Sequence, residues 1–185
     1  ERTPPRAGVP QGGATGGCHR QPGFEGEKSG VRAGLKPAPT ATEDRVITVL
    51  DDYAHHPTEI RASLAAIRQR YRPVRLWCVF QAHQYSRTQA LLEEFAGSFA
   101  DADKVILPEI YFSRDSQASR SAINAGVLAD RIRRGGADAE YVASFDAVCD
   151  YLEQHVNAGD VVVTMGAGDV WKVADEYIQR LRRDR

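Results

Sequence analysis

Short apolar runs alternate with amphipathic stretches from residue 45 to the end of this sequence, and this alternation restricts the folds open to it. Runs of Val, Ile and Leu bounded by polar residues are typical of strands, and apolar residues spaced three and four apart are typical of helices. We predict strands at Val46–Leu50, Val74–Phe80, Lys104–Pro108, Glu140–Ala143 and Val161–Thr164. We predict helices at Pro57–Tyr71, Arg87–Phe99, Ala122–Arg134, Phe145–Val156 and Val170–Arg183.

The order and composition of these elements predict an α/β fold. Continuous apolar strands joined by helices are typical of a parallel sheet that is covered on both faces. We therefore expect a mostly parallel sheet of five to six strands with helices on both faces, in which Val46–Leu50 is a buried strand. Ser86, Ser121 and Ser144 each precede a helical pattern and are expected to cap it, and Gly135-Gly136 is expected to end the third helix.

The first 43 residues differ from the rest of the sequence. They hold nine of the 16 glycines and six of the nine prolines, with almost no apolar periodicity. A segment of this composition has too little apolar surface to pack, so we predict a disordered tail over residues 1–43 and one domain over residues 44–185.

Composition indicates which classes of partner the protein could bind and in which cellular compartment it is expected. The net charge of −1 and the absence of a long apolar run argue against nucleic acid and membrane as partners, and we expect a cytoplasmic protein. Cys18, Cys78 and Cys149 include no Cys-x-x-Cys pair, and Cys78 and Cys149 fall in apolar patterns. These two cysteines are expected to be buried, reduced thiols.

Reactive side chains follow four of the predicted strands. In a parallel sheet joined by right-handed crossovers, the loops that follow the strands lie at one edge, where ligands of α/β proteins bind. These loops are Asp51–Thr58, Gln81–Thr88, Glu109–Asp115 and Met165–Asp169.

Several site chemistries are open at this edge. Asp51, Asp52, His55 and His83 could form the metal centre of an independent hydrolase. The adjacent His55 and His56 project differently, however, so one of them could cap the following helix instead of binding an ion.

An anion pocket is the other option at this edge. Arginine forks bind carboxylate or phosphate, so Arg87 and Arg114, with His83 and Tyr85, resemble a pocket for a small anionic substrate. Gly166-Ala167-Gly168 is a weak phosphate motif, and we expect it to pack the last strand tightly on its helix. The sequence contains no Gly-x-x-x-x-Gly-Lys-Ser/Thr phosphate loop and no Gly-x-Ser-x-Gly elbow.

Three blocks of residues resemble one known family. They read Asp-Asp-Tyr-Ala-His-His-Pro-Thr-Glu at 51–59, Phe-Gln-x-His-x-Tyr-Ser-Arg-Thr at 80–88 and Gly-Ala-Gly-Asp-Val-Trp at 166–171. Their order and spacing are similar to those in the C-terminal domain of the UDP-N-acetylmuramate:L-alanine ligase family. The resemblance covers about residues 45–183 and implies a Rossmann-like α/β fold, in agreement with the pattern above.

The resemblance implies ATP-dependent amide bond formation in peptidoglycan synthesis. In this family the muramate carboxylate attacks the γ-phosphate of ATP, and the amine of L-alanine then displaces phosphate. The complete enzyme would use ATP and Mg²⁺, with L-alanine and UDP-N-acetylmuramate as substrates. This chain alone is expected to hold no cofactor firmly and to contain no metal ligand.

Roles carried over from the family fall on the predicted edge. Arg87 is the best candidate to pair the alanine carboxylate, and the catalytic residues implied are His55, His83 and Arg87. Gln84 stands where the family often has a basic residue, which puts a second cationic contact in doubt. The implied substrate-binding residues are Asp52, Tyr53, His55, His83, Tyr85, Arg87 and Arg114, and the implied cofactor-binding residues are Asp51 and Asp52.

The family's N-terminal and central domains have no counterpart in this sequence. We therefore expect the chain to be a fragment entering the ligase at about Asp44, inactive by itself, with the other domains supplied on another chain if they are present. Three alternatives stay open: a related ligase that recycles a whole tripeptide, the metal-dependent hydrolase, and a binding module. Tyr53 and Glu59 favour the alanine enzyme over the recycling enzyme.

Overall fold

The computed structural model describes residues 46–183 of the chain. Its strands are β1 (Thr48–Asp52), β2 (Leu76–Phe80), β3 (Lys104–Leu107), β4 (Ala139–Tyr141) and β5 (Val161–Met165). Its helices are α1 (Pro57–Tyr71), α2 (Tyr85–Ala90), α3 (Leu92–Ala96), α4 (Gln117–Ala122), α5 (Ala125–Arg134), α6 (Phe145–His155) and α7 (Trp171–Arg183). The predicted tail, its boundary near residue 43, and Cys18 lie outside the described residues.

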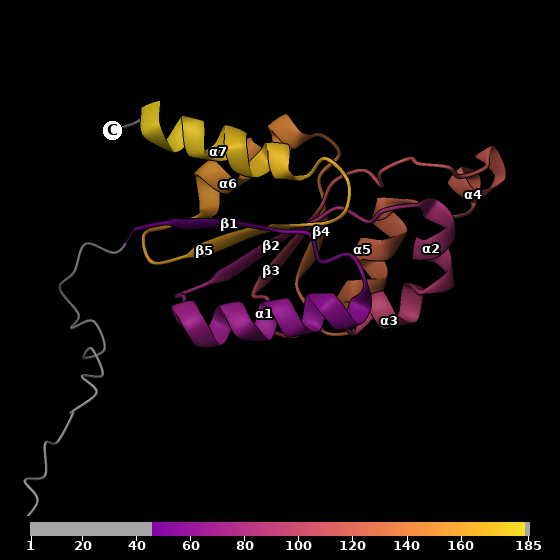
Figure 1. Ribbon diagram of the computed structural model, residues 1–185, viewed down its shortest axis with the longest axis horizontal. Coiled ribbons are helices and arrows are strands. Elements are labelled where there is room, and N and C mark those ends of the chain that lie inside the picture. Colours follow the sequence, from indigo (N-terminus) through magenta and orange to yellow (C-terminus); the bar gives the residue numbers. More distant parts are fainter. Residues whose placement is uncertain (1–45, 184–185) are drawn as a thin grey trace, which may run out of the picture. The chain divides into compact units, whose positions relative to one another are not determined.

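The five strands form one sheet in the order β1-β5-β2-β3-β4, and every neighbouring pair is parallel. Helices α6 and α7 cover one face, and α1 and α5 cover the other (Figure 1). The predicted α/β fold with a parallel sheet is confirmed.

Side chains of the central strands alternate between two apolar layers. Leu76, Cys78 and Phe80 of β2 pack with α1, α3 and α5, whereas Trp77 and Val79 pack with α6 and α7. All five β2 residues are buried, which explains why this strand reads as a continuous apolar run. The two layers give the domain one core on each face of the sheet.

Strand β1 differs from its prediction in place and in burial. It runs from Thr48 to Asp52 because Asp51 and Asp52 pair with Thr164 and Met165 of β5. The strand is an edge strand of the sheet and only half-buried, so the predicted buried strand is wrong. Strand order is set by the crossovers, which local apolarity does not report.

One predicted helix is broken in two. The stretch 87–99 forms α2 and α3 because the backbone leaves helical geometry at Leu91, where φ is −111° and ψ is 24°. The bend lets Phe95 and Phe99 pack against Phe80, with ring centroids 5.5 and 5.3 Å away. Tertiary packing here outweighs helix propensity.

The predicted helix Ala122–Arg134 begins later, as α5 at Ala125, because Ile123 is extended and buried, and the separate short helix α4 before it was not predicted. Asn124 then caps α5 by accepting a hydrogen bond from the backbone N–H of Val127. Ser121 lies inside α4, so its predicted cap is wrong.

Of the three other predicted helix caps, two are confirmed and one is wrong. Ser144 caps α6 by accepting from the backbone N–H of Ala147, and α5 ends at Gly135, as predicted. Ser86 lies within α2 and is not its N-cap, so that prediction is also wrong. A carboxylate from another loop binds the first N–H groups of α2.

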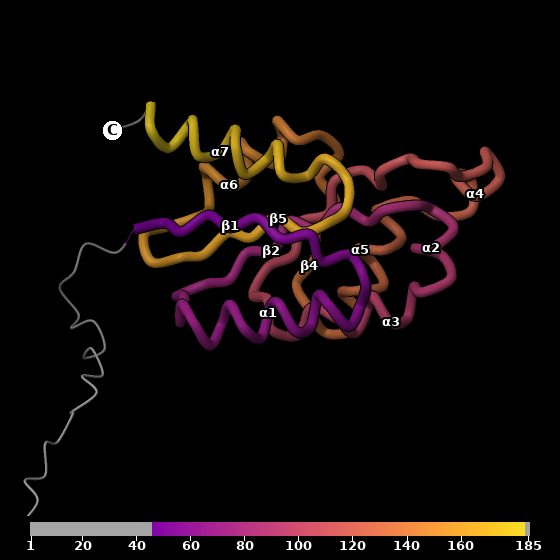
Figure 2. Tube along the Cα trace, viewed as in Figure 1, coloured from indigo at the N-terminus to yellow at the C-terminus, as the bar shows by residue number. Residues whose placement is uncertain are grey.

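The two cysteines between residues 46 and 183 lie in the core, as predicted. Cys78 and Cys149 are buried free thiols, and burial raises the pKa of Cys149 to about 11. Between residues 46 and 183, no helix has the length and apolarity that crossing a membrane requires. The Cα trace in Figure 2 shows the loops that follow the strands on the side of the sheet where β1 enters α1.

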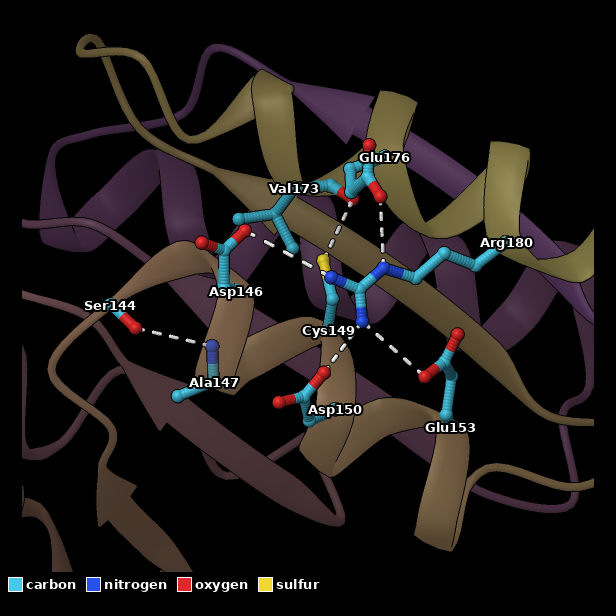
Figure 3. Close-up of polar contacts among 9 residues, drawn as sticks. All are labelled: Ser144, Asp146, Ala147, Cys149, Asp150, Glu153, Val173, Glu176 and Arg180. Carbon is cyan, nitrogen blue, oxygen red and sulfur yellow. Dashed lines mark hydrogen bonds and ion pairs between the residues drawn. The ribbon is translucent and has the colours of Figure 1, made fainter.

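Arg180 links helices α6 and α7, which cover the same face of the sheet. Its guanidinium lies 2.6 Å from Asp150, 2.9 Å from Glu176 and 3.3 Å from Glu153, with Asp146 at 3.9 Å (Figure 3). Hydrogen bonds with Asp150 and Glu176 raise its pKa further above the ordinary range. Because one cation serves four carboxylates from two helices, we expect it to matter more than a single surface ion pair.

We therefore expect Arg180→Ala to lower the midpoint of thermal unfolding by several degrees, since it leaves the carboxylates facing one another. High salt should reduce this loss, because screening weakens the repulsion. Arg182→Ala, an exposed change on the same helix, is the matched control. Equal midpoints for the two variants would contradict the role of Arg180.

Candidate functional site

The loops after β2 and β3 are joined by backbone hydrogen bonds at the carboxyl edge of the sheet. Tyr111 N donates to Ala82 O at 2.9 Å, and Gln84 N donates to Tyr111 O at 3.2 Å. His83 and Tyr111 form an isolated parallel bridge, and their rings stack with centroids 5.4 Å apart. The predicted convergence of these two loops is present in the structure.

Gln81 connects these loops to the loop after β5. Its buried side chain donates from Nε2 to Glu109 O at 3.3 Å and accepts at Oε1 from Asp169 N at 3.1 Å. A Cβ atom on Gly168 would come within 2.6 Å of Gln81 Oε1 and 2.9 Å of Tyr111 Cγ. Because Gly166 and Gly168 have no side chain, the loops that carry Gln81 and Tyr111 can approach them closely. The sequence predicted a different role for these glycines, the tight packing of the last strand on its helix.

Asp51 and Asp52 point to different surroundings because adjacent strand residues face opposite sides of the sheet. Asp51 Oδ1 accepts from Thr164 Oγ1 at 2.6 Å. Asp52 accepts from Ala54 N at 2.9 Å and from Ser63 Oγ at 2.6 Å. The structure does not bring the two carboxylates together, and both Asp52 oxygens are already hydrogen-bonded.

His55 and His56 have separate roles at the start of α1. His56 Nδ1 accepts from Thr58 N at 3.3 Å, and Glu59 accepts from His56 N at 3.1 Å, which together make a capping box. Backbone hydrogen bonds from His55 and His56 lower the pKa of Glu59. The expectation that one histidine caps the helix is confirmed, while the His55 ring lies edge-on to Tyr53, with centroids 5.3 Å apart.

His83 lies at the centre of the positive charges at this edge. Burial, followed by the nearby charges of Arg87, His55 and Arg114, lowers the pKa of His83, and Asp115 opposes this shift. His83 Nδ1 is the one buried side-chain nitrogen or oxygen without a hydrogen-bond partner among residues 46–183. We call His55, His83, Arg87 and Arg114 the cationic cluster, after the charge of its two arginines.

The two arginines of the cationic cluster are not engaged elsewhere in the described part of the chain. Neither guanidinium takes part in an ion pair or a side-chain hydrogen bond among residues 46–183. Arg87 is half-buried on α2, and Arg114 is exposed with φ of 56°. Free guanidinium groups beside a half-buried histidine are suited to bind a small carboxylate or phosphoryl group.

Tyr53 and Tyr85, both predicted to contact substrate, differ in exposure. Tyr53 is 70% exposed beside the cationic cluster. Tyr85 is buried, and its hydroxyl donates to Glu109 Oε1 at 3.0 Å. Burial and this hydrogen bond raise the pKa of Tyr85, and the structure gives it a supporting position below the site surface.

Comparison with known proteins identifies the family. The model of the Mur ligase, glutamate ligase domain matches residues 40–168. UDP-N-acetylmuramate–L-alanine ligase of Acetivibrio thermocellus is 46% identical over 133 residues, covering 72% of this chain and 28% of the relative. The same-named ligase of Geotalea uraniireducens is 47% identical over 143 residues, covering 77% and 31%.

The chain belongs to the Mur ligase family. A solved structure, UDP-N-acetylmuramate–alanine ligase from Thermotoga maritima, shares the fold with a TM-score of 0.59 and 24% identity, covering 75% of this chain and 27% of that one. The chain spans less than a third of the length of the two curated relatives. The match is to the C-terminal domain of these Mur ligases, as the sequence motifs indicated.

Two residues of this Mur ligase domain were not singled out from sequence. Gln81 is a polar residue directly after an apolar strand, which was the available signal for a buried connecting side chain. Asp115 binds the start of α2 across 30 residues of sequence, and no local pattern indicates it. The residues 46–183 contain no group of three His, Cys, Asp or Glu side chains placed to hold a metal ion.

The lowered pKa of His83 gives a prediction for this domain. A base whose pKa falls on folding binds its proton more readily when unfolded. His83 should therefore reduce stability as the pH falls below the ordinary histidine value of about 6.5 and continue to do so down to its folded pKa. NMR titration should give His83 a midpoint below about 6.5, and Arg87→Ala should raise that midpoint by removing a nearby charge. A wild-type midpoint above the ordinary value would contradict this.

Proposed function

We propose that this Mur ligase domain forms the amino-acid-binding wall of a UDP-N-acetylmuramate:L-alanine ligase. The observation that carries the proposal is the cationic cluster, whose charges act together on His83 at the carboxyl edge of the sheet. The 46–47% identity to L-alanine ligases supports the choice of amino acid. In this proposal the domain binds L-alanine and directs its amine toward the activated muramate carboxylate.

Each side chain of the cationic cluster has a separate role in this proposal. Arg87 binds the alanine carboxylate through two parallel hydrogen bonds, and Arg114 adds positive charge beside it. His83, with its lowered pKa, is neutral at pH 7 and accepts a hydrogen bond or a proton from the amine. His55 contributes a further donor near the reacting groups.

ATP and Mg²⁺ enter this proposal as ligands of the complete ligase, because members of the family are ATP-dependent. The described residues do not fit a resident metal site, since no three possible ligands are grouped among them and Asp51 faces away from Asp52, whose two oxygens each accept a hydrogen bond. The exposed Asp51 and Tyr53 would line the nucleotide side of the cleft, with the phosphates held by other parts of the enzyme. UDP-N-acetylmuramate would likewise be held mainly outside residues 46–183.

The proposal is tested by binding and by reconstitution. Titration of the ¹⁵N-labelled chain with L-alanine should shift the signals of His83 and the Arg87 side chain, with D-alanine as a matched control of equal charge. Mixing the chain with an L-alanine ligase of Acetivibrio thermocellus truncated before its C-terminal domain should restore phosphate release that depends on L-alanine.

Two outcomes would overturn the proposal. The first is that neither L-alanine binding nor L-alanine-dependent phosphate release is seen. The second is a preference for a muramyl tripeptide over L-alanine in both assays, which would assign the domain to the recycling ligase instead. The chain without the other domains is expected to release no phosphate above background.

A further inference from the structure

Helix α2, which carries Arg87, begins without a cap from its own sequence. Its N-cap residue, Gln84, makes no side-chain hydrogen bond to the helix and has a φ of 73°. A helix of six residues forms few internal hydrogen bonds, so its position depends on groups outside it. The backbone N–H groups of its first turn need acceptors from elsewhere.

The carboxylate of Asp115 supplies those acceptors. Asp115 Oδ2 accepts from Tyr85 N at 2.7 Å, and Oδ1 accepts from Ser86 Oγ at 2.7 Å and from Ser86 N at 3.3 Å. Burial alone would raise the pKa of Asp115, but the hydrogen bonds from Ser86 and Tyr85 hold it below its usual value. The carboxylate therefore stays ionised at the positive end of α2.

The contact between Asp115 and Ser86 links the chain segments that carry the two arginines of the cationic cluster. Arg114 precedes it directly, and its hydrogen-bond partner Ser86 precedes Arg87. The same two loops are joined at their other end by the His83–Tyr111 bridge. One carboxylate and one backbone bridge thus fix the loop that carries Arg114 against the helix that carries Arg87.

We propose that Asp115 is a positioning residue that sets the placement of Arg87 relative to Arg114 by binding the start of α2. Its functional meaning rests on the proposed amino-acid-binding role. Asp115 adds a negative charge beside the cationic cluster, so its contribution is geometric and not attraction of the anion. Both oxygens of the carboxylate are used, so an amide side chain replaces them only in part.

The experiment compares the unsubstituted 185-residue chain with Asp115→Ala, Asp115→Asn and Asp175→Ala, the last being an exposed carboxylate on α7. Amide exchange at Tyr85 and Ser86 should accelerate by about tenfold or more in Asp115→Ala and less in Asp115→Asn. The side-chain Nε–Hε signals of Arg87 and Arg114 should shift and become more mobile in the same order. Asp175→Ala should match the wild type in all readouts.

Binding of L-alanine provides the functional readout. The affinity should fall by about tenfold in Asp115→Ala and recover in part in Asp115→Asn. If Asp115→Ala does not fold, the Ser86 amide and the arginine signals of Asp115→Asn decide the question, since this variant keeps one acceptor.

Unchanged exchange at Tyr85 and Ser86 would overturn the proposal. Faster exchange with unchanged arginine signals would overturn it too, because Asp115 would then close a helix end without placing Arg87. If the wild type does not bind L-alanine, the proposed function fails, while exchange and arginine signals still decide the role of Asp115.

Discussion

Arg87→Ala is expected to weaken L-alanine binding about a hundredfold, because removing one partner of a carboxylate–guanidinium pair costs about 2–5 kcal/mol and each 1.4 kcal/mol is tenfold. The expectation rests on a guanidinium that is half-buried, next to His83, and without an ion pair in the described part of the chain. Calorimetric or NMR titration with L-alanine measures the effect.

Two further variants separate the contribution of the paired hydrogen bonds of the Arg87 guanidinium from the contribution of its charge. Arg87→Lys keeps the charge but cannot form two parallel hydrogen bonds, so its affinity should lie between those of the wild type and Arg87→Ala. Arg134→Ala, at the exposed end of α5, is the control for loss of a positive charge far from the cluster. The assignment of Arg87 fails if Arg87→Ala and Arg134→Ala bind L-alanine equally well.

Gly166→Ala is expected to destabilise the domain by roughly 2–5 kcal/mol, through backbone strain combined with overpacking. Gly166 has a φ of +148°, and a Cβ atom there would lie 2.6 Å from the backbone oxygen of Gln81. That oxygen belongs to the backbone between β2 and α2, so it cannot move without shifting the loop that carries His83. Urea unfolding followed by circular dichroism measures the change in free energy.

Substitutions at two other glycines separate the cost of backbone strain from the cost of overpacking. Gly136 has a φ of +98° with nothing within 4 Å of an added Cβ, so Gly136→Ala reports the cost of strain alone, about 1–2 kcal/mol. Gly97 has no such φ, and its nearest contact would be at 3.9 Å, so Gly97→Ala should leave stability nearly unchanged. A Gly166→Ala variant as stable as Gly97→Ala would show that the contact with Gln81 is not limiting.

Most of the fold could be predicted from local sequence patterns, because each buried strand and each amphipathic helix has its own spacing of apolar residues. The helix Pro57–Tyr71 was predicted to the residue, since Pro57 and Glu59 mark its start and its apolar face is regular. The break at Leu91 and the later start of α5 after Ile123 were missed because they depend on what Phe95, Phe99 and Ile123 pack against.

The arrangement of the candidate site could be predicted from the sequence only in part. His83, Arg87 and Arg114 were placed together from sequence because the loops after parallel strands share one edge. Tyr85 was expected at the substrate, yet its side chain is buried against Glu109, since the direction of a side chain depends on its packing partners. Asp51 and Asp52 were grouped as neighbours, although their places in β1 direct them to opposite faces.

The sequence by itself determined the α/β class, the parallel sheet, the family and the edge that carries the cationic cluster, because these follow from periodicity and from motifs with fixed spacing. Tertiary structure alone decided the edge position of β1, the division of the helix predicted at 87–99, the connection of three loops through Gln81, and the binding of α2 by Asp115. The physical reason is that these features are contacts between residues far apart in the chain, and such contacts leave no local pattern in the sequence.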